Sequence, residues 1–275
     1  LVVELSPENR KAEAASYLSV AVFGGLSVGP IIGEFVMGDV AESARGLNAG
    51  HFNAVFVVTA GAAVLAALVS LTAPAFVGER PARIRRKVSW FHKRSLLPGA
   101  ILAVGMAAWT AFTSFVPTFS KSIGLSGSAQ FFALYSILCL FLRLFGAKTP
   151  ERLGLRRSVW MAMSFLLCGV TSVAVLGNEF GIWVGTIFFA LGVSFFYPSL
   201  LAMAVEGSDE NERVEIVSSF TSFFEIGGVM GGLALGLVGE LFGERSTFVG
   251  GMVFASLGLL LLARTRQQSS PTIAV

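Results

Sequence analysis

Residues 180–204 read FGIWVGTIFFALGVSFFYPSLLAMA, a run of 25 residues without a charged side chain. About 20 apolar residues are enough for a helix to cross the hydrocarbon core of a bilayer, whereas core helices of soluble proteins are shorter and amphipathic. Similar runs recur along the chain, in which 54% of residues are hydrophobic and 13% are charged. A soluble domain carries about 25% charged residues. The sequence therefore predicts an all-α polytopic membrane protein.

Eight membrane-spanning helices are predicted, because each apolar run is long enough to cross the bilayer with some tilt. Uniformly apolar runs favour helices over a barrel, whose strands are short and alternate in polarity. The predicted spans are residues 12–36, 52–75, 96–119, 127–147, 157–177, 180–204, 214–239 and 246–264.

Basic residues predict the orientation of these spans. If the first span runs outward, 16 of the 20 Lys and Arg fall in one set of loops and at the two chain ends. Arg45, Lys121 and Arg245 fall on the opposite side, and Arg143 lies within or at the end of a span. Since cytoplasmic loops are enriched in Lys and Arg, both termini are predicted to be cytoplasmic. Residues 78–95 are the most basic loop and suit a linker between two bundles, solvated beside anionic headgroups.

An internal repeat appears when the chain is shifted by 202 positions. A polar turn, a helix start and two glycines four residues apart then recur, with six spans between the copies. Parallel repeats of six helices are one way to build a secondary transporter. The matching pairs are Ser6 with Ser208, Glu8 with Glu210, Asn9 with Asn211, Glu13 with Glu215, Ser16 with Ser218, Gly25 with Gly227 and Gly29 with Gly231.

The first copy of the repeat continues as GLSVGPIIGE at residues 25–34. This stretch resembles the GxxxGPxxGG signature (motif C) of the fifth helix in the major facilitator superfamily, which occurs mainly in exporters. Gly25, Gly29, Pro30 and Gly33 match, and Glu34 replaces the last glycine. Small residues four apart let another helix approach closely, and the proline permits a bend. A static packing face is the alternative interpretation.

Residues 143–157, RLFGAKTPERLGLRR, are similar to the family's motif A loop in its second-half copy, between helices eight and nine. The resemblance implies a clasp of a carboxylate and arginines that closes the cytoplasmic side. Ala147 and Glu151 depart from the usual Gly and Asp, and a solvated basic loop is the alternative. The residues assigned to this loop are Glu151, Arg152, Gly154, Arg156 and Arg157.

Residues 192–199 and 218–227 are similar to helices ten and eleven of the same family. In this register the eight spans correspond to helices 5–12, a partial superfamily fold, and helices 1–4 are expected to be encoded upstream of an N-terminally truncated chain. The expected organisation is a remnant of the first six-helix bundle at 1–77, the basic linker at 78–95, the second bundle at 96–266 and a cytoplasmic tail at 267–275.

Five residues are candidates for proton coupling or for the substrate cavity. Glu225 lies about a dozen positions into its span, where a carboxylate is costly unless it is paired, protonated or facing water. It either couples transport to protons or serves as a structural acid. Arg143 either snorkels to the interface or binds an anion. Trp109 and Thr113 lie in the span equivalent to cavity-lining helix seven, and Tyr197 ends an aromatic run; ordinary helix packing is the alternative for these three.

The resemblance implies a monomeric secondary active transporter of the cytoplasmic membrane, with proton-coupled efflux of small organic molecules as the preferred function. Its expected partners are a small-molecule substrate, lipid and protons, and no nucleic acid. Uptake of a sugar or organic acid, a non-transporting scaffold or sensor, and an unrecognised membrane enzyme are the alternatives. The sequence contains no HExxH zinc motif or Walker loop, so no enzyme activity, cofactor or metal is predicted.

Overall fold

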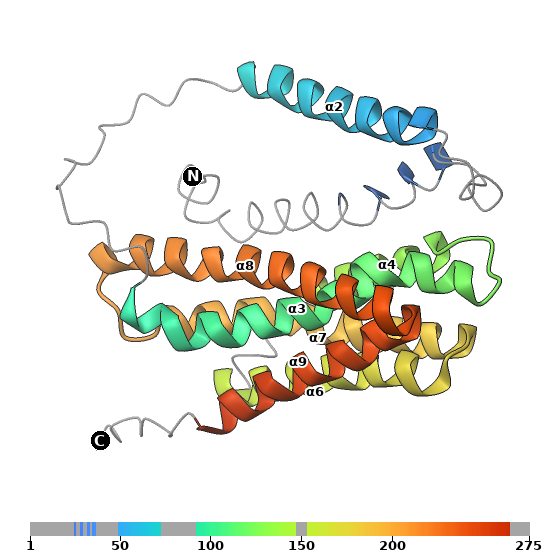
Figure 1. The fold of residues 1–275 in the computed structure, drawn as a ribbon. Helices are drawn as coiled ribbons and strands as arrows, with labels where there is room; N and C mark the ends of the chain where they lie inside the picture. Colours follow the sequence, from blue (N-terminus) through green and yellow to red (C-terminus); the bar gives the residue numbers. More distant parts are fainter. Residues whose placement is uncertain are drawn as a thin grey trace.

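The computed structural model describes residues 25, 28, 29, 32, 33, 35, 36, 49–72, 92–146 and 153–264. These residues form long helices joined by short turns (Figure 1). The helices are α2 (Ala49–Leu71), α3 (Lys93–Ser122), α4 (Ala129–Gly146), α6 (Leu155–Leu176), α7 (Glu179–Val205), α8 (Glu210–Phe242) and α9 (Glu244–Arg264).

The predicted spans from residue 52 onward each coincide with one of these helices. Six of the helices are long and apolar enough to cross a membrane, and the apolar part of α4 is shorter. The described positions of the first predicted span, between residues 25 and 36, are helical, and the rest of that span lies outside the described residues. The helix ends differ from the predicted ones by a few residues: α8 continues to Phe242, and only Gly243, with a φ of 89°, separates it from α9. The all-helical membrane fold is confirmed.

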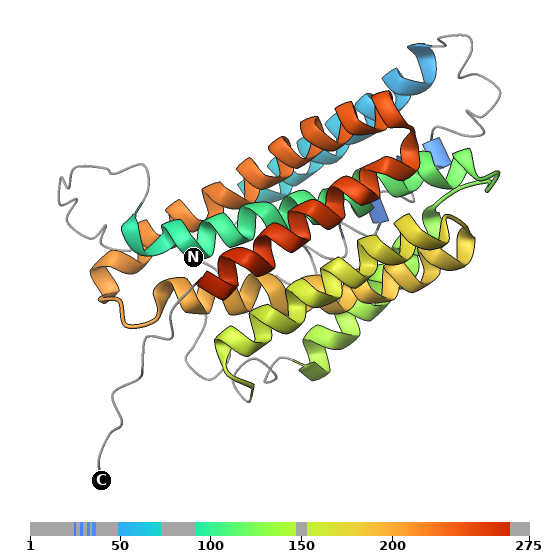
Figure 2. The ribbon, with the colours of Figure 1, turned by 60° about the horizontal axis from the view of Figure 1, so that its bottom comes forward.

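Helices α3, α4, α6, α7, α8 and α9 pack as one bundle (Figures 1 and 2). Helix α3 is central, because it contacts α6, α7, α8 and α9. Its Phe112 ring is fully buried and lies 5.5 Å from the Phe132 ring of α4 and 4.6 Å from the Phe189 ring of α7. The core of the bundle is therefore aromatic at the place where α3, α4 and α7 meet.

The second copy of the glycine pair lies where α8 crosses α3. A Cβ atom at Gly227 would lie 2.6 Å from the Ala103 Cα, and one at Gly231 would lie 2.5 Å from the Ala107 Cα. Real Cβ atoms do not approach so closely, so the backbones of α3 and α8 touch because glycine has no side chain. Contact of this kind is what small residues at four-residue spacing provide between membrane helices.

Arginines at helix starts bind the carbonyl ends of neighbouring helices. Arg94 of α3 donates to the Gly207 carbonyl at 2.6 Å, beside the end of α7. Arg245 of α9 donates through Nε to the Ala174 carbonyl at 2.6 Å and through Nη2 to the Val175 carbonyl at 2.5 Å, both at the end of α6. The last carbonyls of a helix have no partner within it and carry partial negative charge. Arg245 therefore satisfies carbonyls in the last turn of α6, Arg94 binds the turn directly after α7, and both arginines tie neighbouring helices together.

Replacing Arg245 by methionine is expected to lower the free energy of unfolding by about 2 kcal/mol, because two charge-assisted hydrogen bonds to the end of α6 are lost. Titration of the detergent-solubilised chain with sodium dodecyl sulfate, followed by circular dichroism, measures this change. Lys121→Met is the control, since Lys121 is also an exposed basic residue, at the far end of α3. Equal losses in both variants would contradict the role assigned to Arg245.

Large apolar surfaces remain exposed on α2 and α8. The apolar segment of α2, residues 53–71, has no buried residue, and Figure 1 shows α2 apart from the bundle. On α8, Val229, Leu233 and Leu237 are exposed along the length of the helix. Apolar surface of this extent is typical of helices that contact lipid or other membrane helices.

Candidate functional site: an aromatic cluster beside Glu225

Side chains from four helices meet in a cluster of aromatic rings. The Trp109 Nε1 of α3 donates a hydrogen bond to the Tyr135 hydroxyl of α4 at 3.1 Å. The Trp109 ring lies 6.5 Å from the Phe224 ring of α8, which in turn lies 6.0 Å from the Tyr197 ring of α7. Tyr197 also lies 5.6 Å from Phe220, one turn earlier on α8. We call Trp109, Tyr135, Tyr197, Phe220 and Phe224 the aromatic cluster.

The cluster has a buried side and an accessible side. Tyr135 and Phe220 are buried, whereas Trp109, Tyr197 and Phe224 are only half-buried. The accessible rings present flat apolar faces together with the polar edges of an indole and a phenol, a combination that suits aromatic and amphipathic ligands. Two of the sequence candidates, Trp109 and Tyr197, are thereby brought together through Phe224.

Thr113 lies one turn beyond Trp109 on α3 and is half-buried. Its hydroxyl donates to the Trp109 carbonyl at 3.5 Å, which is a bond within the helix. Residues four apart share a helix face, so Thr113 extends the accessible side of the cluster along α3.

Glu225 is exposed and directly follows Phe224 on α8. Successive residues of a helix point about 100° apart. Gly227 faces α3 and Phe224 faces Trp109 and Tyr197, so the Glu225 carboxylate lies on the open side of α8, at the border of the cluster. Its role, either in proton coupling or as a structural acid, stays a prediction.

Arg143 lies on the inner side of α4. It shares one helix face with Cys139 and Tyr135, four and eight residues earlier. Cys139 is buried with its Sγ 3.9 Å from the Ala190 carbonyl of α7, and Tyr135 bonds to Trp109. Arg143 itself is half-buried and its Nε has no access to solvent. Whether the guanidinium reaches the interface or binds an anion stays a prediction.

The Tyr135 hydroxyl ties α4 to α3, so Tyr135→Phe is expected to lower the free energy of unfolding by about 1–2 kcal/mol, because the Trp109 indole loses its acceptor in a largely buried site. Tyr197→Phe is the matched control, since among the described residues its hydroxyl makes no hydrogen bond. Unfolding in sodium dodecyl sulfate compares the two variants. An equal effect of both changes would show that the bond contributes nothing.

The loop resembling motif A lies only partly within the described residues. Glu151 and Arg152 lie outside them, so the predicted clasp between a carboxylate and arginines is untested. Gly154 has a φ of 83° and directly precedes α6. Arg156 donates from Nη2 to the Leu262 carbonyl of α9 at 3.2 Å, whereas Arg157 is exposed.

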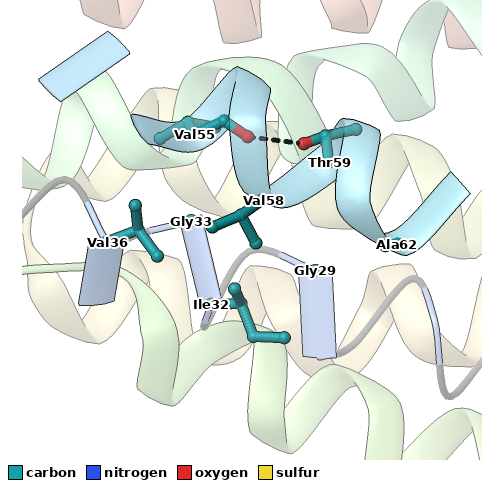
Figure 3. A pocket seen from close by; sticks show the side chains of 8 residues that line it. All are labelled: Gly29, Ile32, Gly33, Val36, Val55, Val58, Thr59 and Ala62. Carbon is teal, nitrogen blue, oxygen red and sulfur yellow. Dashed lines mark hydrogen bonds between the residues drawn. The ribbon is translucent and has the colours of Figure 1, made fainter. Parts of the chain in front are cut away.

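Two of the glycines resembling motif C, Gly29 and Gly33, line an apolar pocket against α2 (Figure 3). The pocket has a volume of about 240 Å³. Within the described part of the chain, no atom lies within 4 Å of a Cβ placed at Gly25, Gly29 or Gly33. Among the described residues, the close helix contact expected at these glycines is therefore seen only in the second copy of the repeat, at Gly227 and Gly231. Pro30 lies outside the described residues. The pocket is lined by Gly29, Ile32, Gly33, Val36, Val55, Val58, Thr59 and Ala62.

Residues 25–29, GLSVG, also fit the GxSxG pattern of serine hydrolases. That pattern acts at a sharp turn between a strand and a helix. Gly25 and Gly29 are both helical here, so the context for a nucleophilic serine is not met.

Comparison with known proteins gives the family. Residues 1–232 match the Major Facilitator Superfamily. The chain belongs to this superfamily. It is 24% identical to the MFS-type transporter YhhS of Escherichia coli K12 over 261 residues, and 24% identical to YhhS of Salmonella typhi over 257 residues. No solved structure matches the chain.

The alignments cover 90% of this chain and 63% of the E. coli protein, and 89% of this chain and 60% of the Salmonella protein. The chain thus spans about three-fifths of the length of these relatives. Membership confirms the resemblance that motifs C and A indicated, and with six long apolar helices it identifies a multi-pass membrane protein.

Three members of the aromatic cluster were not singled out by sequence reasoning. Tyr135 lies within an apolar run without a local motif, so only the packing of α4 against α3 reveals it. Phe220 and Phe224 lie four residues apart directly before Glu225, and that spacing alone places two rings on one helix face. The spacing was a usable signal, although it does not indicate which helix the rings contact.

Proposed function

We propose that the protein is a secondary active transporter that exports small amphipathic organic molecules in exchange for protons. The observation that supports this best is the aromatic cluster, whose half-buried rings from α3, α7 and α8 border the exposed Glu225. The rings offer stacking surface to the substrate, and the carboxylate offers a protonatable group. Such a pair is what exchange of an organic molecule for a proton requires.

In this proposal the protein acts as a monomer in the cytoplasmic membrane, with its termini in the cytoplasm. The clasp of Glu151 with the arginines of the motif A loop closes the cytoplasmic side, and the bend at Pro30 in the motif C helix accommodates the change of state. The six-helix bundle of α3 to α9 then rocks against the other half while the substrate stays near the bilayer midplane.

The test is transport by the protein expressed from its gene and reconstituted into vesicles with an internal pH indicator. A panel of aromatic amphipathic dyes is loaded on the cytoplasmic side and a proton gradient is imposed. Dye movement that depends on the gradient and carries protons the opposite way is expected. Dye binding without movement would support the scaffold alternative and overturn the proposal.

A second candidate function is uptake of an organic acid. It is favoured by Arg143, a cation on the inner face of α4 that shares this face with Tyr135. A half-buried arginine suits a carboxylate because its guanidinium forms paired hydrogen bonds with both oxygens. Gradient-driven accumulation of small organic acids, abolished in Arg143→Gln and absent for the dyes, would establish this function in place of export.

A further inference from the structure

Three arginines gather at one end of the packed pair α6 and α9. Arg156 at the start of α6 donates a hydrogen bond from Nη2 to the Leu262 carbonyl at 3.2 Å, near the end of α9. This bond places the start of α6, where Arg157 follows Arg156, next to the end of α9, whose last residue is Arg264. Both of these side chains are exposed, and Figure 1 shows the end of α9 next to α6.

On α9, Arg264 continues an exposed apolar face. Val253, Leu257 and Leu260 are 57%, 43% and 59% exposed, and Arg264 follows Leu260 by four residues. Spacings of four, three and four residues keep side chains on one face of a helix. The opposite face of α9, with Ala255 and Leu262, is buried in the bundle. Arg264 thus terminates the surface of α9 that faces away from the protein.

Helix α6 also has an exposed face that ends in an arginine. Arg157, Cys168 and Val175 are exposed and are separated by 11 and 7 residues, which correspond to three and two turns. The buried residues of α6, such as Val159 and Leu166, lie on other faces. An arginine therefore marks the same end of the outward face on both helices.

The charge at this end is entirely positive within the two helices. Helix α6 contains no acidic residue, and the only one in α9, Glu244, lies at its opposite end. Trp160, half-buried one turn into α6, adds an indole at the depth where interfacial tryptophans are found. Guanidinium groups bind phosphate through paired hydrogen bonds, so this end is complementary to a phosphate.

We propose that the end of the α6–α9 pair binds an anionic phospholipid. Arg157 and Arg264 hold the headgroup phosphate, and an acyl chain lies along Val253, Leu257 and Leu260. Arg156 positions the site through its bond to Leu262, without contacting the lipid. A free phosphate ion would use the arginines alone, whereas a lipid uses both the arginines and the apolar face that leads away from them.

The experiment is a titration of the detergent-solubilised chain with dioleoyl-phosphatidylglycerol and, separately, dioleoyl-phosphatidylcholine, read by native mass spectrometry. The unmodified chain is expected to bind one phosphatidylglycerol more tightly than any phosphatidylcholine. In the double variant Arg157→Gln with Arg264→Gln, the affinity for this phosphatidylglycerol is expected to fall about 25-fold, since each basic residue near the lipid contributes about fivefold. The double lysine variant is expected to lose less affinity than the glutamine variant, because the charge remains while the paired hydrogen bonds are lost.

The matched control replaces Lys93 and Arg213 by glutamine, because both are exposed basic residues at the starts of other helices. An equal loss in this control would overturn the proposal, since general surface charge would then explain the binding. Retained affinity in the double glutamine variant would also overturn it. Competition with excess inorganic phosphate distinguishes a phospholipid from a free phosphate ion as the ligand. Displacement of the lipid by phosphate alone would identify an anion site in place of a lipid site.

Discussion

Replacing Gly227 by valine is expected to lower the free energy of unfolding by about 3 kcal/mol, the upper range for overpacking a close contact. At this position α8 touches the backbone of α3, and a new Cβ would lie 2.6 Å from the Ala103 Cα. A flexible side chain could move aside, but the atoms in the way are backbone atoms of a central helix. The helices must therefore separate, which also weakens the neighbouring contact of Gly231 with Ala107.

The adjacent Gly228 supplies a matched control. It has the same residue type and lies on the same helix, yet no described atom lies within 4 Å of a Cβ placed there. Gly228→Val is expected to change the stability by less than about 0.5 kcal/mol. Titration with sodium dodecyl sulfate measures both variants. Similar values for the two would mean that the α3–α8 contact is not as close as the structure describes.

Glu225→Gln is expected to reduce proton-driven substrate movement to the rate of protein-free vesicles, if the proposed exchange with protons is correct. The amide has the size of the carboxyl group but cannot bind and release a proton. Substrate binding by the aromatic cluster should survive, because Trp109, Tyr197 and Phe224 are unchanged. Exchange of labelled for unlabelled substrate, without a proton gradient, is therefore expected to persist in this variant.

The two measurements separate the roles considered for this acid. Loss of both net movement and exchange would indicate a structural or substrate-binding carboxylate, and unchanged net movement would exclude Glu225 from proton coupling. Glu240→Gln is the control, since Glu240 is an exposed acid near the C-terminal end of α8. Its replacement is expected to leave both rates unchanged.

Prediction from sequence succeeded best for the helices themselves. A run such as residues 180–204 carries no charged side chain, and in lipid its backbone N–H and C=O groups must be satisfied within the segment, so helix is the stable local structure whatever surrounds it. The helix ends were predicted less accurately, because polar residues at a membrane surface can be helical or non-helical with similar free energy. Helix α8 thus reaches Phe242, three residues beyond the predicted 239.

The candidate site was predicted less completely than the helices. The sequence indicated Trp109, Tyr197 and Glu225 separately, by residue type and depth, but not their partners. Tyr135 and Phe224 complete the cluster because α4 and α8 approach α3 from different sides. Arg143 could point outward or inward by its position in the span alone, and its shared face with Cys139 and Tyr135 selects the inner side.

By itself, the sequence determined that the chain is a bundle of membrane helices of the major facilitator superfamily, because hydropathy and the glycine repeat are local and periodic. Only the tertiary structure decided which glycines touch a neighbouring backbone and which arginines bind helix ends. It also decided which aromatic rings meet beside Glu225. These outcomes depend on the rotation of each helix about its axis, which is set by packing between residues distant in sequence.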